Sequence, residues 1–150
     1  MILEIDAQVL REIHAHAESS YPEEGAGLML GKTNGDHKHI SAIVKLTNVR
    51  EEAARHNRYL IAPQDYVRAE DEADRLGLEV LGVFHSHPDH PNRPSEFDRE
   101  WAWPWLSYLI TSVLSGEAVE SRAWRLHDDR AGFEEEEIKV IERTKFARNQ

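Results

Sequence analysis

The prediction of the fold begins with residues 78–98, LEVLGVFHSHPDHPNRPSEFD. The first part, Leu78–His85, is an apolar run of strand length, and side chains two residues apart on a strand point to the same face. His85 and His87 are therefore expected side by side at the carboxyl end of this strand, where open sheets tend to bind ligands. Pro88 ends the strand, and residues 88–94 are too rich in Pro and Asn for regular structure.

A short helix is predicted at residues 95–101, and it brings a third polar group to the histidines. Ser95 and Asp98 lie three residues apart, so they share one face of a helix. The same residues also resemble a helix capping box, a role compatible with a place in a site. Two histidines and one carboxylate with an open fourth position are typical of catalytic zinc, which lowers the pKa of its water to about 7.

A general base is still needed beside such a metal, and an acidic segment upstream offers it. Residues 21–25, Tyr-Pro-Glu-Glu-Gly, precede the predicted buried strand 25–31. A carboxylate of this segment, Glu23 or Glu24, could take a proton from water and pass it to the leaving amine. Ser95 could donate a hydrogen bond to the oxyanion of the tetrahedral intermediate.

These residues resemble the JAMM motif of MPN-domain zinc metalloproteases. The pattern is His-Ser-His-Pro, six residues, Ser, two residues and Asp, and the segment Pro-Glu-Glu-Gly-Ala-Gly-Leu-Met-Leu-Gly resembles the family's glutamate-bearing strand. The resemblance spans roughly residues 1–130 and fills every motif position. It implies one zinc ion on His85, His87 and Asp98, with Glu24 as catalytic acid and base and Ser95 as oxyanion donor.

The resemblance also implies a fold and a substrate class. The fold would be α/β, a single cytidine-deaminase-like αβα domain at 1–140 with a central mixed sheet flanked by helices, followed by a flexible tail at 141–150. A short chain with no large insertion is similar to the small stand-alone prokaryotic branch. That branch implies hydrolysis after the C-terminal Gly-Gly of a ubiquitin-like sulfur-carrier protein, with a homodimer as one assembly.

The remaining pattern predicts helices alternating with strands, in the order αββαβαββ, which indicates one mixed sheet covered by helices. Helices are predicted at 6–20, with Asp6 as N-cap, and at 64–76, between Pro63 and Gly77. Strands are predicted at 38–47, 59–62, 106–114 and 119–126, with a hairpin turn at Asn34-Gly35. Residues 134–143 fit a strand or a helix, and residues 48–58 are polar enough for a loop.

Composition limits the classes of function. The chain has 150 residues, which suits one domain, and no apolar run long enough to span a membrane. The net charge of -10 argues against nucleic-acid binding. The absence of cysteine excludes thiolate chemistry, and with no signal peptide expected at the N-terminus the default location is the cytoplasm.

Other clusters admit plain explanations. Trp101, Trp103 and Trp105 are expected in the core, with a binding face for a carrier protein or a dimer contact as the alternative. Residues 134–137, four glutamates, are expected to be solvated, and His37 and His39 to be surface residues with no carboxylate pattern nearby. Two other functions stay open: a non-catalytic MPN scaffold, and a DNA-repair-associated relative with a similar histidine motif.

Overall fold

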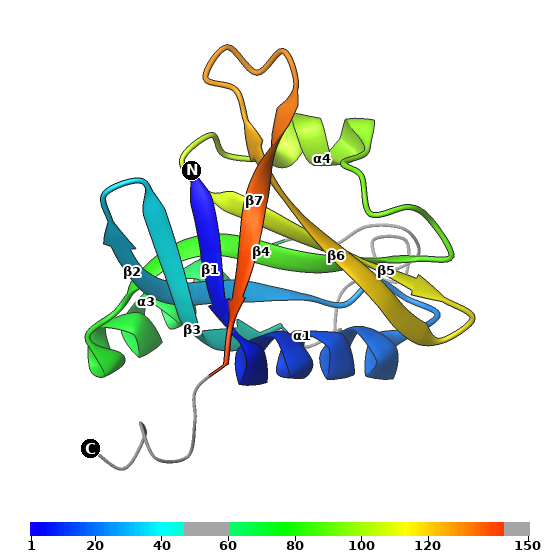
Figure 1. Ribbon diagram of the computed structural model, residues 1–150, viewed down its shortest axis with the longest axis horizontal. Helices are drawn as coiled ribbons and strands as arrows, with labels where there is room; N and C mark the ends of the chain where they lie inside the picture. The colour runs from blue at the N-terminus through cyan, green and yellow to red at the C-terminus, as the bar shows by residue number, and fades with distance from the viewer. Residues whose placement is uncertain (47–60, 143–150) are drawn as a thin grey trace.

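Seven strands in residues 1–46 and 61–142, the ranges that the computed structural model describes, form one mixed sheet that closes into a barrel (Figure 1). The order around the barrel is β1-β3-β2-β4-β5-β6-β7, and β1 pairs in parallel with both β3 and β7. The strands are β1 (Ile2–Asp6), β2 (Ala26–Asn34), β3 (His37–Lys45), β4 (Glu79–Pro88), β5 (Ser107–Leu114), β6 (Glu117–Leu126) and β7 (Phe133–Ile141). The predicted α/β class and single mixed sheet are confirmed, and the closure is a finding of the structure.

The strand β1 was not predicted from the sequence, and it completes the barrel. Its five residues alternate between half-buried and buried, with Leu3 and Ile5 fully buried. A strand of five residues carries little periodic pattern of its own. Its pairing cannot be inferred locally either, because both of its partners lie far along the chain. Its pairing with β3 and with β7 is what removes the free edges of the sheet.

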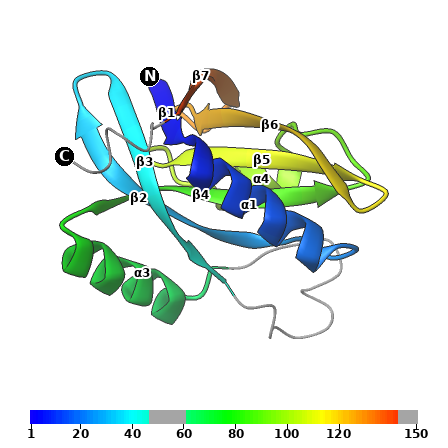
Figure 2. The ribbon, with the colours of Figure 1, turned by 60° about the horizontal axis from the view of Figure 1, so that its bottom comes forward.

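Within the described residues, three helices accompany the barrel as the sequence predicts: α1 (Ala7–Ser20), α3 (Pro63–Leu76) and α4 (Glu96–Trp101). Figure 2 shows α1 lying across one face of the sheet, and its residues Val9 and Ile13 join Met29 and Phe84 in a buried cluster. Asp6 stands at the N-cap of α1 but makes no capping hydrogen bond. Its carboxylate lies 2.9 Å from Nε2 of His39 instead.

The structure contains the predicted hairpin turn and shows which of two predicted conformations the segment after residue 132 adopts. The hairpin between β2 and β3 turns through Gly35, whose positive φ of 65° suits glycine, with Asn34 as the last strand residue. Residues 133–141 form the strand β7, so the strand reading of this segment is correct. Residues 61 and 62 are not in a strand. The loop predicted at 48–58, the first half of the strand predicted at 59–62, and nearly all of the tail predicted at 141–150 lie outside the described residues.

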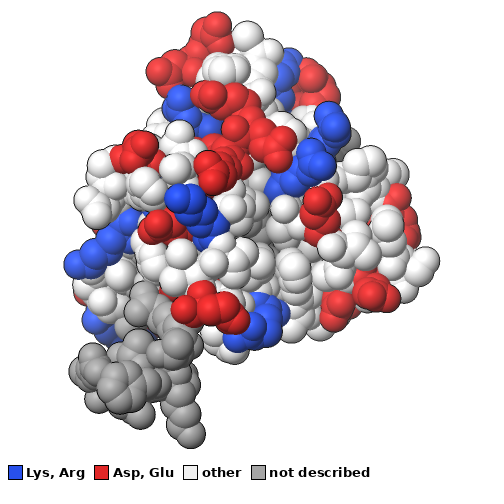
Figure 3. Space-filling view, in the orientation of Figure 1, with Lys and Arg blue, Asp and Glu red and all other residues white. Residues whose placement is uncertain are grey.

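Two details of the predicted surface are wrong: one glutamate of the acidic run is buried, and carboxylates lie beside His39. Glu136 alternates inward on β7 and is 4% exposed, while Glu134, Glu135 and Glu137 face solvent. On the face shown in Figure 3, acidic side chains gather in the upper half, around β6 and β7. His39 is not isolated from carboxylates either, since Glu4 and Asp6 lie within 3.4 Å of its ring nitrogens.

The three tryptophans are not core residues. Trp101 and Trp105 are 59% and 65% exposed, and Trp103 is 37% exposed. Trp103 and Trp105 stack on each other with ring centroids 5.7 Å apart, and Tyr66 packs edge-on against Trp103. The buried core is made of other residues, and the indoles of Trp101, at the end of α4, and of Trp103 and Trp105, before β5, lie at the surface.

Candidate metal centre

The candidate site lies at the carboxyl end of β4, which runs between β2 and β5 in the sheet. His85 and His87 occupy this end and their ring centroids are 5.1 Å apart, as the two-residue spacing predicts. The side chain of His85 is fully buried, and that of His87 is 10% exposed. Parallel pairing of β4 with β5 continues to Pro88, so both histidines stand on a backbone that is held by hydrogen bonds.

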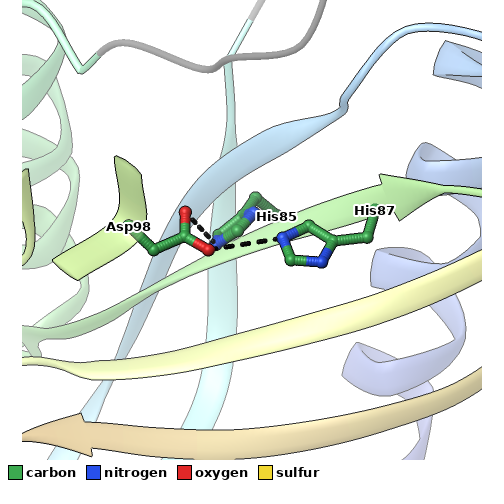
Figure 4. Close-up of side chains that lie close together, drawn as sticks. All are labelled: His85, His87 and Asp98. Atoms are coloured by element: carbon green, nitrogen blue, oxygen red, sulfur yellow. Dashed lines mark ion pairs between the residues drawn. The ribbon is translucent and has the colours of Figure 1, made fainter. Parts of the chain in front are cut away.

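Asp98 reaches the two imidazoles from α4 (Figure 4). Its Oδ1 lies 3.6 Å from Nε2 of His85, and its Oδ2 lies 3.4 Å from Nε2 of His87. The helix begins with a capping box: Ser95 Oγ accepts from the Asp98 amide at 3.1 Å, and Asp98 Oδ2 accepts from the Ser95 amide at 2.7 Å. The cap therefore orients the carboxylate, in addition to starting the helix.

The geometry of these three side chains fits a zinc ion. Zinc binds imidazole nitrogen and carboxylate oxygen at about 2.0–2.2 Å in a tetrahedron, which places neighbouring ligand atoms about 3.4 Å apart. The separations of 3.4 and 3.6 Å, each to a different oxygen of Asp98, are close to that spacing and longer than a direct charge-assisted hydrogen bond of about 2.8 Å. One ligand atom from each of His85, His87 and Asp98 can be chosen so that all lie within 4.8 Å of one another.

The electrostatics of the cluster favour a bound cation. Burial lowers the pKa of His85 to about 4, so this imidazole is neutral at neutral pH, as a metal ligand must be. Burial opposes the ionisation of Asp98, but His85, His87 and the Ser95 amide outweigh it and hold the pKa of Asp98 at about 2. Burial likewise opposes the protonation of His87, yet Asp98 and the Pro91 carbonyl raise its pKa. A buried carboxylate anion beside a neutral imidazole is stabilised by a divalent cation.

The tautomer of His87 follows from its partner. Its Nδ1 lies 2.7 Å from the carbonyl oxygen of Pro91, and a carbonyl can only accept, so Nδ1 carries a hydrogen. Nε2 is then the nitrogen that faces Asp98 and offers its lone pair to a metal. A backbone carbonyl that orients a histidine in this way is a common feature of metal sites.

The irregular segment 88–94 is tied to the barrel by residues that the sequence analysis did not single out. Asn92 is 6% exposed; its side chain donates to Glu120, and its carbonyl accepts from the indole of Trp124 at 3.0 Å. Ser112 Oγ donates to the carbonyl of His90 at 2.7 Å. In the sequence Asn92 is interpreted only as a turn residue, because its partners Glu120 and Trp124 on β6 follow more than 25 residues later.

The upstream glutamate is brought to the site by the pairing of β2 with β4. Ala26 pairs with His85, and Gly25 exchanges two bonds with Ser86: Ser86 N donates to Gly25 O at 2.9 Å, and Gly25 N donates to Ser86 Oγ at 2.8 Å. Glu24, which directly precedes Gly25, then lies near His87, and the charge of Glu24 helps to raise the pKa of His87. Ser86 is a further residue that the sequence analysis did not single out.

Beside the three converging side chains lies a pocket of about 450 Å³. Glu24 lines this pocket, whereas Glu23 is not among its lining residues, and Ser95 lines it from α4. Because Ser95 Oγ accepts from the Asp98 amide, its hydroxyl hydrogen is available to a bound molecule. The full lining is Pro22, Glu24, His87, Pro88, Asp89, His90, Pro91, Arg93 and Ser95.

Comparison with known proteins places the chain among similar sequences. The family described as prokaryotic homologs of the JAB domain matches residues 6–127. A protein of Thermus thermophilus, named "Probable TtuB-protein conjugate cleaving protease", is 29% identical over 116 residues, 75% of this chain and 74% of that protein. The CysO-cysteine peptidase of Mycobacterium tuberculosis is 26% identical over 144 residues, 94% of this chain and 92% of that protein.

Two solved structures are similar to this chain in both fold and sequence. The solution structure of a Salinibacter ruber protein is 39% identical, with a TM-score of 0.73, covering 92% of this chain and 91% of that one. The solution structure of DSY2949 from Desulfitobacterium hafniense is 30% identical, with a TM-score of 0.82 and 96% of both chains covered. The similarity thus extends over nearly the whole barrel, and the family match over residues 6–127 spans the segments in which the candidate residues lie.

Proposed function

Because the chain belongs to the family of prokaryotic homologs of the JAB domain and is a peptidase, we propose that it works with one zinc ion. The proposed reaction is hydrolysis of the amide bond after the C-terminal glycine of a ubiquitin-like sulfur-carrier protein. The observation that carries the proposal is the convergence of His85, His87 and Asp98 beside a pocket that Glu24 and Ser95 line. The expected kinship with the cytidine-deaminase fold and the homodimer are parts of the proposal that rest on the family resemblance.

In the proposed mechanism each side chain has one task. His85, His87 and Asp98 hold zinc, which when bound supplies Lewis acidity toward water and a carbonyl oxygen. Glu24 accepts a proton from the attacking water on a carboxylate oxygen and returns it to the departing nitrogen, so the same group acts as base and then as acid. Ser95 Oγ donates its hydrogen to the developing oxyanion, a bond that strengthens as the carbonyl becomes tetrahedral.

The substrate class is supported by the relatives. The names of the Thermus and Mycobacterium proteins refer to a TtuB-protein conjugate and to CysO-cysteine. A desampylase of Haloferax volcanii shares 30% identity over 105 residues. These are names of conjugate-cleaving enzymes, and we carry the class over as a carrier protein with a C-terminal Gly-Gly.

The experiment compares the two adjacent glutamates in the upstream segment. Glu24→Gln and Glu23→Gln change the charge of the chain equally, but only Glu24 lines the pocket. The substrate is a small ubiquitin-like carrier extended beyond its Gly-Gly by a reporter peptide, and mass spectrometry follows the product. Glu24→Gln is expected to keep its zinc and to lower kcat by at least about 10²–10⁴-fold, the usual contribution of a general acid–base. Glu23→Gln is expected to turn over as the unaltered chain does.

The same experiment separates the peptidase from the scaffold alternative. Treatment with a chelator should abolish cleavage, and added zinc should restore it. A chain that binds no metal at neutral pH, or one whose Glu24→Gln variant cleaves at the normal rate, contradicts the proposed function.

A further inference from the structure

We infer that Arg93 binds the α-carboxylate of the residue that leaves. The preferred substrates would then be carrier adducts that end in a single amino acid, rather than carriers joined to a lysine side chain. This inference rests on the proposed function and goes beyond it, because it assigns a specificity-determining role to a residue outside the metal-binding and proton-transfer set. It starts from the pocket that Glu24 and Arg93 line together.

The orientation of a substrate in this pocket follows from Glu24. The group that protonates the departing nitrogen must be within hydrogen-bond reach of it. The part of the pocket next to Glu24 therefore receives the leaving group, and the carrier's glycine lies on the other side of the scissile bond. Arg93 belongs to the segment 87–95, which supplies most of the pocket's lining, and Pro22 and Glu24 supply the rest.

The pocket has the dimensions of a site for a small group. The two segments that line the pocket, before β2 and at 87–95, are joined by a hydrogen bond from the Tyr21 hydroxyl to Asp89 Oδ2 at 2.6 Å. Asp89 Oδ1 also accepts from the Ser115 amide at 2.8 Å. Its volume of about 450 Å³ is at the lower end of the range for pockets that enclose small molecules. A single amino acid fits such a space, whereas a lysine side chain must continue into a folded protein.

Among the described residues that line this pocket, Arg93 is the one permanent cation. Its side chain is exposed, and it forms no hydrogen bond or ion pair with a residue in the described ranges. Arg99, six residues later, is bound to Glu96 and to the carbonyl of Arg130. Asp89, from the same segment, accepts from the Tyr21 hydroxyl and the Ser115 amide, and within the described ranges it forms no ion pair with Arg93.

A free guanidinium in a chain of net charge -10 selects for an anion. Its planar donors match a carboxylate in two parallel hydrogen bonds. When a carrier adduct ends in one amino acid, the α-carboxylate lies two bonds from the scissile nitrogen and is ionised at neutral pH. When the leaving nitrogen is the ε-amine of a lysine within a protein, the α-carbonyl of that lysine is part of a peptide bond. Arg93 would therefore favour the first class.

The test uses three synthetic peptides with the same sequence up to Gly-Gly. The first continues to an alanine with a free carboxylate, the second to an alanine amide, and the third joins Gly-Gly to the ε-amine of a lysine in a peptide. Hydrolysis of each consumes one water and gives a Gly-Gly carboxylate and a free amine. For the unaltered chain, kcat/KM for the free acid should exceed that for the amide by about tenfold to hundredfold, the effect of one charge-assisted pair.

Arg93→Gln should bring the ratio of acid to amide close to one, with the loss chiefly in KM, and Arg93→Lys should give an intermediate ratio. Arg68→Gln is the matched control, because it removes the same charge from an exposed position on α3. Zinc content of each variant verifies that the site is intact. Binding of the acid and amide peptides to the Glu24→Gln variant measures the same preference without turnover.

Three results would overturn the inference and leave the proposed function standing. The first is equal cleavage of the acid and the amide by the unaltered chain, and the second is an equal loss on both peptides in Arg93→Gln. The third is faster cleavage of the lysine-linked peptide than of the free acid. A failure to cleave the peptides and the carrier fusion, with zinc bound, contradicts the proposed function itself.

Discussion

Replacing Ser86 by alanine tests how the glutamate is held against the metal ligands. Ser86 is 1% exposed, and its hydroxyl oxygen accepts from the amide of Gly25 at 2.8 Å. Alanine leaves this buried N–H without an acceptor, which costs about 1–3 kcal/mol in the free energy of unfolding. The reciprocal bond, from the Ser86 amide to the Gly25 carbonyl, stays, so the strand pairing survives while the segment before Gly25 loosens.

Loosening of the segment before Gly25 should lower kcat. Glu24 directly precedes Gly25, and a shift of about 1 Å in a positioned catalytic group lowers kcat by about 10²-fold. Zinc content should not change, because β5, α4 and residues 88–94 hold the metal ligands independently of the Ser86 hydroxyl. Urea unfolding, zinc analysis and kcat on a Gly-Gly peptide measure the three quantities separately.

A second buried serine supplies the control. Ser107 on β5 is fully buried and accepts from Nζ of Lys38 at 3.0 Å, at the opposite end of β5 from the residues paired with His85 and His87. Ser107→Ala should lower stability to a similar degree without a specific loss of kcat. If Ser86→Ala loses stability and keeps the normal kcat, or loses kcat only in proportion to its zinc, then the hydroxyl does not position Glu24.

Two further predictions concern packing and pH. A Cβ added at Gly27 would lie 2.3 Å from the ring of Phe84, so Gly27→Ala should lower the free energy of unfolding by about 1–3 kcal/mol. Gly132 has open space around it, so Gly132→Ala should change the free energy of unfolding little. Thermal unfolding of the two variants tests this difference. Burial raises the pKa of Tyr108 to about 12, so between pH 10 and 12 the folded chain keeps a proton that the unfolded chain releases, and stability should fall by up to about 3 kcal/mol as pH rises through that window. Tyr108→Phe should lose this part of the alkaline slope in urea unfolding, and an unchanged slope would contradict the assignment.

The parts of the site that were predictable from the sequence are those encoded by local spacing. His85 and His87 share a face because they are two residues apart on a strand, and Asp98 follows a helix cap that its own segment contains. Helix α3 was predictable because Pro63 and Gly77 mark its ends. In each case the residues that determine the conformation lie within one turn or one strand.

The parts that escaped prediction depend on contacts between distant segments. The barrel closes through β1, whose partners lie more than 30 and more than 130 residues later in the chain. Glu136 looks like one member of an acidic run, and only the pairing of β7 with β6 shows that it faces inward beside Ala123. The tryptophans look like core residues, because hydrophobicity alone does not reveal that the buried core is made of other residues.

The position of Glu24 combines both kinds of information, and it shows where the proposed function is most sensitive. The three metal-binding candidates come from 14 consecutive residues, but the glutamate comes from the segment just before β2, some 60 residues earlier. It reaches them only through the register in which Ala26 pairs with His85. A slip of one residue in that ladder would turn the glutamate to the other face of the sheet and bring Glu23 or Gly25 in its place. The two hydrogen bonds between Gly25 and Ser86 oppose such a slip at the end of the ladder, next to the site. A chain could therefore keep all three metal-binding side chains and still lose peptidase activity through this register alone, which is why zinc content and turnover must be measured separately.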